Sequence, residues 1–107
     1  MLTFNLKKEW FEKIKSGEKT HEYRVATNYW FKRLLVIEEK YGKLVFTIKK
    51  DFCIFCCGYP NKNDNSKRLK ARIEYIQIVN GLNTDLKIDK DVLDTKFELI
   101  SEREVEE

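Results

Sequence analysis

The sequence has few of the residues that shape irregular or disulfide-linked proteins. It contains one proline, four glycines and three cysteines among 107 residues. The cysteines, Cys53, Cys56 and Cys57, are odd in number and tightly clustered, so they do not form a disulfide framework. No apolar run approaches the ~20 residues of a membrane span, and no signal peptide is visible at the N-terminus. We therefore expect a reduced, cytoplasmic protein with no membrane partner.

What the chain does contain is apolar and charged residues in quantity. Hydrophobic residues make up 42% of it, aromatic residues 13% and charged residues 36%. This composition and length fit one compact domain over residues 1–107, with 101–107 as a frayed acidic tail. The net charge is only +3, but residues 61–72 hold five basic residues and one acid. A basic segment apart from an acidic tail is compatible with a polyanion partner and equally with solvated faces.

Hydrophobic periodicity predicts alternating strands and helices in the first part of the chain. Trp10, Phe11 and Ile14 form the apolar face of a helix that ends at Gly17, because glycine suits the left-handed position after a helix. A second apolar pattern predicts another helix that ends at Gly42. The predicted elements are strands at 2–6 and 19–25 and helices at 7–17 and 28–42.

The rest of the chain predicts mostly strands. Near Ile76 and Ile78 the apolar phase changes faces, which indicates a bulge or burial on both faces. Short strands separated by turns favour an α+β fold, a small mixed β-barrel of about five to six strands with two or three helices packed on it. The predicted elements are two strands or one bent strand at 43–59 with a turn at 49–51, a loop at 60–66, and strands at 67–79 and 94–100.

A short motif follows the first predicted helix. Gly17, Lys19, Glu22 and Arg24 form the pattern G-x-K-x-x-E-x-R after a hydrophobic strand and an amphipathic helix. This arrangement resembles the ASCH domain of the PUA-like superfamily of small β-barrels, in its short phage and bacterial form. The resemblance covers most of the chain and is weakest over residues 36–57.

The resemblance implies RNA binding in a cleft beside the motif, as proposed for ASCH domains. A few relatives are hydrolases, one a ribonuclease and another an amidohydrolase that removes the acetyl group of N4-acetylcytidine. The amidohydrolase uses a lysine of this motif and a threonine three residues later, where this chain has Glu22. A carboxylate does not replace a hydroxyl nucleophile in acyl transfer, and Thr20 is one position off.

The first candidate site is the motif itself. Glu22 and Arg24 are two apart on a predicted strand and share a face, while Lys19 lies at the corner between helix and strand. Arginine and lysine suit phosphate, and glutamate accepts from an exocyclic amine of a base. Alternation predicts His21 and Tyr23 on the opposite face. The structural alternative is a salt bridge that fixes the strand.

The second candidate site is a basic row on the strand at 67–79. Such a row can follow phosphates, and neighbouring rings can stack on bases. The alternative is a solvated strand face. The residues are Lys67, Arg68, Lys70 and Arg72, with Tyr59 and Trp30 as the stacking rings.

Other chemistry-bearing residues favour a structural role. The three cysteines and the lone His21 lack the spacing of a zinc site, so we expect buried thiols and no metal or cofactor. His21 could act as a general base, but a strand histidine with polar neighbours is the simpler interpretation. Asp85, Asp89 and Asp91 lack the calcium-loop pattern. Trp10 is assigned to the core.

The sequence thus predicts an RNA- or nucleotide-binding domain. Lys19 and Arg24 would contact phosphate, and Glu22 would orient Arg24 or bind a base amine. One alternative is a small hydrolase of a modified nucleoside or RNA, with Lys19 and Glu22 as its catalytic pair. Another is a protein-interaction module without activity.

Overall fold

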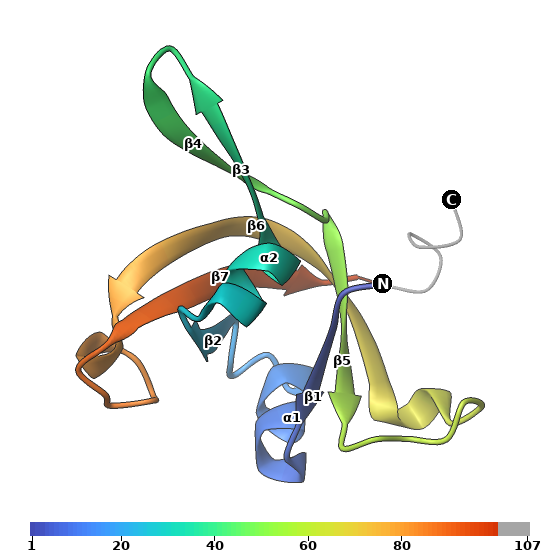
Figure 1. Cartoon of the computed structure of the whole chain (residues 1–107). Helices are drawn as coiled ribbons and strands as arrows, with labels where there is room; N and C mark the ends of the chain where they lie inside the picture. The colour runs from blue at the N-terminus through green and yellow to red at the C-terminus, as the bar shows by residue number, and fades with distance from the viewer. Residues whose placement is uncertain (101–107) are drawn as a thin grey trace.

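The computed structural model describes residues 1–100, so the tail predicted at 101–107 lies outside the described residues. Within the described part, strands and helices alternate at first and strands then dominate (Figure 1). No helix there is long and apolar enough to cross a membrane. The elements are β1 (Thr3–Leu6), α1 (Lys8–Lys15), β2 (His21–Val25), α2 (Asn28–Leu34), β3 (Leu35–Lys40), β4 (Lys43–Ile48), β5 (Phe52–Cys57), β6 (Arg68–Asn80) and β7 (Asp91–Leu99), with 3-10 turns at Asn65–Lys67 and Gly81–Asn83.

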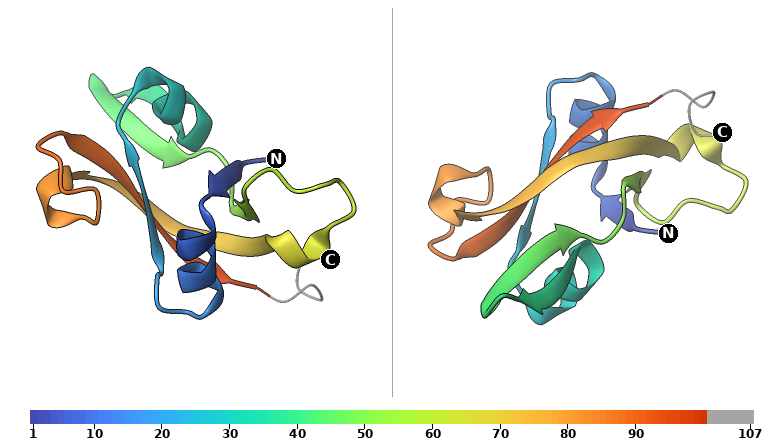
Figure 2. Two further views of the ribbon diagram at one scale, coloured as in Figure 1. Left: turned by 90° about the horizontal axis from the view of Figure 1, so that it is seen from below. Right: turned by 90° about the horizontal axis from the view of Figure 1, so that it is seen from above.

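Five strands form one curled sheet in the order β1-β5-β6-β7-β2. β1 pairs in parallel with β5, and the other neighbours are antiparallel. The pairing of β6 with β7 shifts register between Ile73 and Tyr75, and such a bulge bends a strand and increases its twist. The long β6 and β7 curve accordingly (Figure 2). The fold is α+β, a half-barrel of the small PUA-like type, as the sequence predicts.

The core lies on the inner face of this sheet, under the two helices. The ring of Phe55 is fully buried and lies 5.4 Å from the ring of Phe4 and 4.5 Å from that of Phe97. α1 contributes Phe11 and Ile14 to this core, as its periodicity predicts. Burying these side chains holds α1 against the sheet, and the site described below borders the C-terminal end of β1 and the first turn of α1.

The predicted helix at 28–42 is wrong beyond its first half. α2 ends at Leu34, and the chain continues at once into the hairpin β3–β4. Val36 and Ile37 are β-branched and favour a strand. Tyr41 and Gly42 both have positive φ, 54° and 73°, which is the geometry of a two-residue hairpin loop. An apolar pattern of this length fits a short helix followed by a strand as well as one helix.

The hairpin forms its own two-stranded sheet and stands away from the half-barrel (Figure 1). Its base is fixed to α2. The backbone N–H of Lys49 donates to the Leu34 carbonyl at 3.0 Å, and Lys49 Nζ donates to the Lys32 carbonyl at 3.0 Å. The rings of Phe31 and Phe46 lie 6.5 Å apart. The rest of the hairpin has no layer packed on it among residues 1–100.

Candidate functional site

A tight turn after α1 places Lys19 beside the start of β2. Gly17 takes a φ of 85°, and the backbone N–H of Lys19 donates to the Lys13 carbonyl at 3.0 Å. Lys19 therefore precedes the regular strand, which begins at His21, and strand alternation does not fix its direction. Its side chain turns toward Glu22 rather than away from it.

Glu22 is the centre of the site. It is a glutamate only 5% exposed, and both of its carboxylate oxygens face cations. Oε2 accepts from Arg24 Nη2 at 3.0 Å, while Oε1 lies 3.7 Å from Lys19 Nζ and accepts from the backbone N–H of Tyr23 at 3.2 Å. A buried carboxylate needs such partners, because an unpaired buried charge is very costly. The three charged residues of the motif therefore form one cluster, as the sequence predicts.

The two cations are also held by rings. Lys19 Nζ lies 4.8 Å from the centre of the Trp10 ring and 5.2 Å from that of Tyr23. The Arg24 guanidinium lies 4.9 Å from the centre of the Trp30 ring. Such cation–π contacts fix a flexible side chain over an apolar surface. Lys19 Nζ also donates to Asp85 Oδ2 at 2.7 Å, and Arg24 donates to the Asn5 carbonyl at 3.4 Å.

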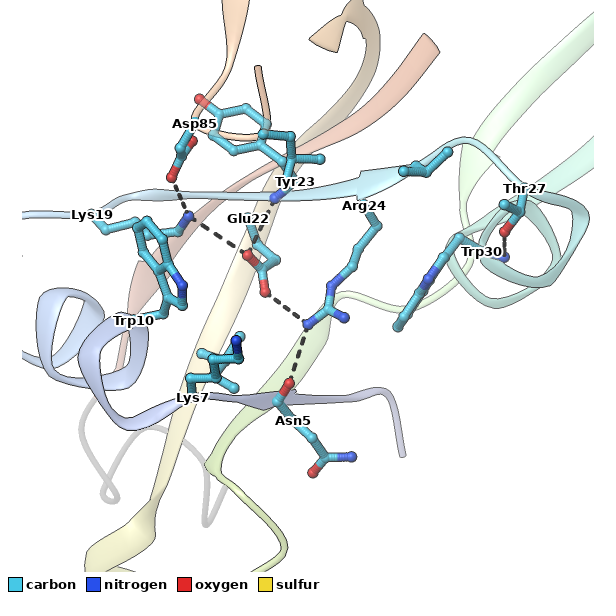
Figure 3. A pocket seen from close by; sticks show the side chains of 13 residues that line it. Asn5, Lys7, Trp10, Lys19, Glu22, Tyr23, Arg24, Thr27, Trp30 and Asp85 are labelled. Atoms are coloured by element: carbon cyan, nitrogen blue, oxygen red, sulfur yellow. Dashed lines mark hydrogen bonds and ion pairs between the residues drawn. The ribbon is translucent and has the colours of Figure 1, made fainter. Parts of the chain in front are cut away.

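These groups line an open cleft of about 470 Å³ between β1, α1, β2 and α2. Figure 3 shows Trp10 beside Lys19 at one end, Trp30 beside Arg24 at the other, and Glu22 between them. This volume lies within the range of small-molecule sites, about 300–1,000 Å³. The lining is completed by Asn5, Leu6, Lys7, Tyr23, Val25, Thr27, Asp85 and Leu86.

Three lining residues differ from the sequence-based assignments. Trp10 is only partly buried and forms a wall of the cleft, although its place in the helical pattern assigned it to the core. Tyr23 also lines the cleft, although strand alternation places it on the face opposite Glu22 and Arg24, and the centre of its ring lies 5.2 Å from Lys19 Nζ. Asp85 comes from the loop before β7, and no local pattern connects it with Lys19.

The basic row lies elsewhere, and none of its residues lines the cleft. Arg68 donates to the backbone carbonyls of Pro60, Asn61, Lys62 and Asp64, so it fixes the loop at 60–66. Lys67 Nζ lies 3.7 Å from Asp64 Oδ2, in an ion pair. Lys70 and Arg72 are exposed on the sheet face opposite the core, and the Arg72 guanidinium lies 5.9 Å from the centre of the Phe52 ring. Tyr59 is 90% exposed.

A second polar cluster lies next to the cleft. His21 Nδ1 lies 2.7 Å from Asp94 Oδ1, and Asp94 Oδ2 accepts from Gln77 Nε2 at 2.8 Å. Asp94 is 4% exposed. The His21 ring stacks on Tyr23, with ring centres 6.0 Å apart. Burial, and then the charges of Asp94 and Asp85, raise the pKa of the Tyr23 hydroxyl, so it stays a neutral donor at physiological pH.

The three cysteines all lie in β5 and are free thiols, with Cys53 and Cys56 buried and Cys57 partly buried. Burial, and then the charge of Glu22, raise the pKa of Cys53 to about 12. Burial also raises the pKa of Cys56, against the opposing effect of Arg68. A neutral thiol is a poor nucleophile and a poor metal ligand. Among residues 1–100, no group of three or more histidine, cysteine or acidic side chains is arranged to hold a metal ion.

Comparison with known proteins gives one match. The family model of the ASCH domain matches residues 4–86, a segment that contains the motif, both tryptophans of the cleft and Asp85. No curated protein and no solved structure matches the chain.

Proposed function

The chain belongs to the ASCH domain family, and we propose that it binds single-stranded RNA, or a nucleotide, in the cleft around Glu22. The observation that carries the proposal is a buried carboxylate that holds two cations between two tryptophans. Phosphates need cations, and unstacked bases need rings. The cleft offers both groups side by side.

The contacts suggest a role for each group. Arg24 offers a planar fork whose remaining N–H groups suit a phosphate. Lys19 has three donors, so it can hold Asp85 and still reach a phosphate. Trp10 and Trp30 are the stacking surfaces for bases at the two ends of the cleft. Glu22 fixes the positions of both cations.

Fluorescence anisotropy of a labelled single-stranded RNA pool tests this proposal directly. We expect salt-dependent binding in which the two cleft cations alone contribute about −1.4 to the logarithmic salt slope, because two phosphate contacts release roughly 0.7 ion each from a single strand. A fully paired RNA of the same length should bind more weakly, since its bases cannot reach the rings. Absence of binding at low salt, or a preference for the duplex, would contradict the proposal.

A second candidate function is RNA cleavage, favoured by the His21–Asp94 pair. In the tautomer in which Nδ1–H donates to Asp94 Oδ1, Nε2 is left as a proton acceptor. The ring borders a hollow of about 340 Å³. This hollow shares four lining residues with the cleft: Trp10, Lys19, Tyr23 and Asp85. There Nε2 would take the proton of a ribose 2′-hydroxyl. The 2′-oxygen would attack the adjacent phosphorus, and the 5′-oxygen would leave with a proton from water.

Incubation of 5′-labelled RNA with wild type and His21→Asn tests this second function. The asparagine amide can still donate to Asp94, so the fold is retained while the base is lost. We expect wild type to release fragments that end in 2′,3′-cyclic phosphate, and the variant to be at least a hundredfold slower. Intact RNA with wild type, or equal cleavage by the variant, would exclude this role for His21.

A further inference from the structure

The hairpin β3–β4 carries a group of exposed apolar side chains. Ile37, Leu44 and Phe46 lie on one face of it, since Ile37 pairs with Phe46 and Glu39 with Leu44. These three side chains are 46–66% exposed, and Tyr41 at the tip is fully exposed. A two-stranded hairpin is marginally stable in water by itself. Such a surface is therefore suited to a partner.

The charge of this part of the chain indicates which partner it fits. Residues 28–50, which we call the arm, contain six basic and two acidic residues, a surplus of four positive charges. The whole chain has a net charge of only +3. Among the described residues Lys32, Arg33 and Lys43 form no ion pair, whereas Lys40 pairs with Glu38. The arm is thus a basic surface with exposed rings, which suits a polyanion with stacking groups.

The arm also borders the cleft, because its helix α2 carries a residue that lines the cleft. Trp30 lines the cleft, while its neighbour Phe31 contacts Phe46 of the hairpin. Tyr29 meets the Trp30 ring edge-on, with ring centres 5.1 Å apart, and the Arg33 guanidinium lies 4.3 Å from the centre of the Tyr29 ring. A strand that leaves the cleft past Trp30 therefore meets a second ring and a second arginine.

We propose that the arm is a second contact surface for single-stranded RNA, which extends the strand held in the cleft. This inference rests on the proposed function. Phe46 and Tyr29 would stack on bases, while Lys32, Arg33 and Lys43 would contact phosphates. Two short surfaces joined in this way raise affinity for a long strand, because the second contact is intramolecular.

The test compares two RNA lengths in anisotropy titrations. An oligomer of about 4 nucleotides fits the cleft alone, and one of about 12 reaches the arm, within the site sizes known for small β-barrels. Two arm variants separate charge from stacking. Lys32→Gln/Arg33→Gln/Lys43→Gln removes three exposed charges, and Phe46→Leu keeps an apolar contact with Phe31 but removes the ring.

We expect Phe46→Leu to leave affinity for the short oligomer unchanged, and the charge variant to weaken it by no more than about threefold through lost long-range attraction. Both variants should bind the long oligomer about tenfold more weakly, or worse. For the long oligomer, the salt slope of the charge variant should be smaller in magnitude by about 2, because each of the three lost phosphate contacts releases roughly 0.7 ion. A longer RNA also has more positions at which it can occupy the cleft, and this raises its affinity for wild type and variants equally. The difference in affinity between wild type and the arm variants therefore measures the contribution of the arm. The matched control, Lys8→Gln/Lys15→Gln/Lys90→Gln, removes three exposed lysines outside the arm and should keep the full slope within about one unit.

The outcomes that contradict the inference are distinct from failure of the proposed function. If wild type binds the short oligomer and the arm variants match it on the long one, the arm makes no RNA contact. If neither oligomer binds, the cleft proposal fails as well. Concentration-dependent sedimentation of wild type that Phe46→Leu abolishes, with RNA affinity unchanged, would assign the arm to a second copy of the chain.

Discussion

Replacing Lys19 and Arg24 together by glutamine is expected to weaken binding of single-stranded RNA at least a hundredfold. Each is a charged donor, and a hydrogen bond to a charged group contributes about 1.5–3 kcal/mol, so the loss of two gives about 3 kcal/mol or more. Glutamine amides can still donate hydrogen bonds to Glu22, so the buried carboxylate keeps hydrogen-bond partners. Anisotropy at two salt concentrations measures the effect, and thermal melting checks the fold.

The matched control for this variant lies on the other face of the sheet. Lys70→Gln/Arg72→Gln removes the same charge from exposed positions outside the cleft. We expect about threefold weaker binding, because only long-range attraction is lost. If the control loses as much affinity as the cleft variant, RNA follows the basic row of β6, and the outer face of the sheet is the interface.

The charged centre of the site was predictable because it is local in sequence. Glu22 and Arg24 are two apart on a strand and must share a face, and Lys19 lies in the turn before it. The rest of the cleft depends on tertiary structure. Asp85 reaches Lys19 only because the sheet pairs β7 with β2 and so brings the loop before β7 near β2. Periodicity assigned Trp10 to the core. The hydrophobic pattern identifies an apolar position on a helix, but it does not show whether that position faces the core or lines a cleft.

The sheet was predictable for similar reasons, and the hairpin was not. In β6 polar and apolar residues alternate, and a phase change marks the bulge that the register confirms. In residues 28–40 no turn or break in the sequence marks the change from helix to strand, because the two-turn helix α2 leads directly into β3. The basic row shows a further limit. Alternation places Arg68, Lys70 and Arg72 on one face, but it does not show that Arg68 fixes a loop instead of facing solvent.

Replacing Glu22 by glutamine is expected to destabilise the fold by about 2–3 kcal/mol. Removing one partner from a buried ion pair costs about 3–5 kcal/mol, because the remaining charge is left uncompensated. The value is lower here because the Arg24 side chain is 26% exposed and Lys19 keeps its contact with Asp85. The amide also brings N–H donors toward two cations. Chemical denaturation measures the free energy of unfolding, and the melting temperature should fall by about 10 °C or more.

The same substitution in an exposed ion pair provides the comparison. Glu74 lies 3.8 Å from Lys96, and its side chain is 40% exposed. Exposed pairs contribute about 0–1 kcal/mol, so Glu74→Gln should change stability by less than about 0.5 kcal/mol. If both variants lose equally little, the Glu22 cluster is solvated and cannot fix the two cations. Since the proposed function needs Lys19 and Arg24 held in place, that result would also remove its structural basis.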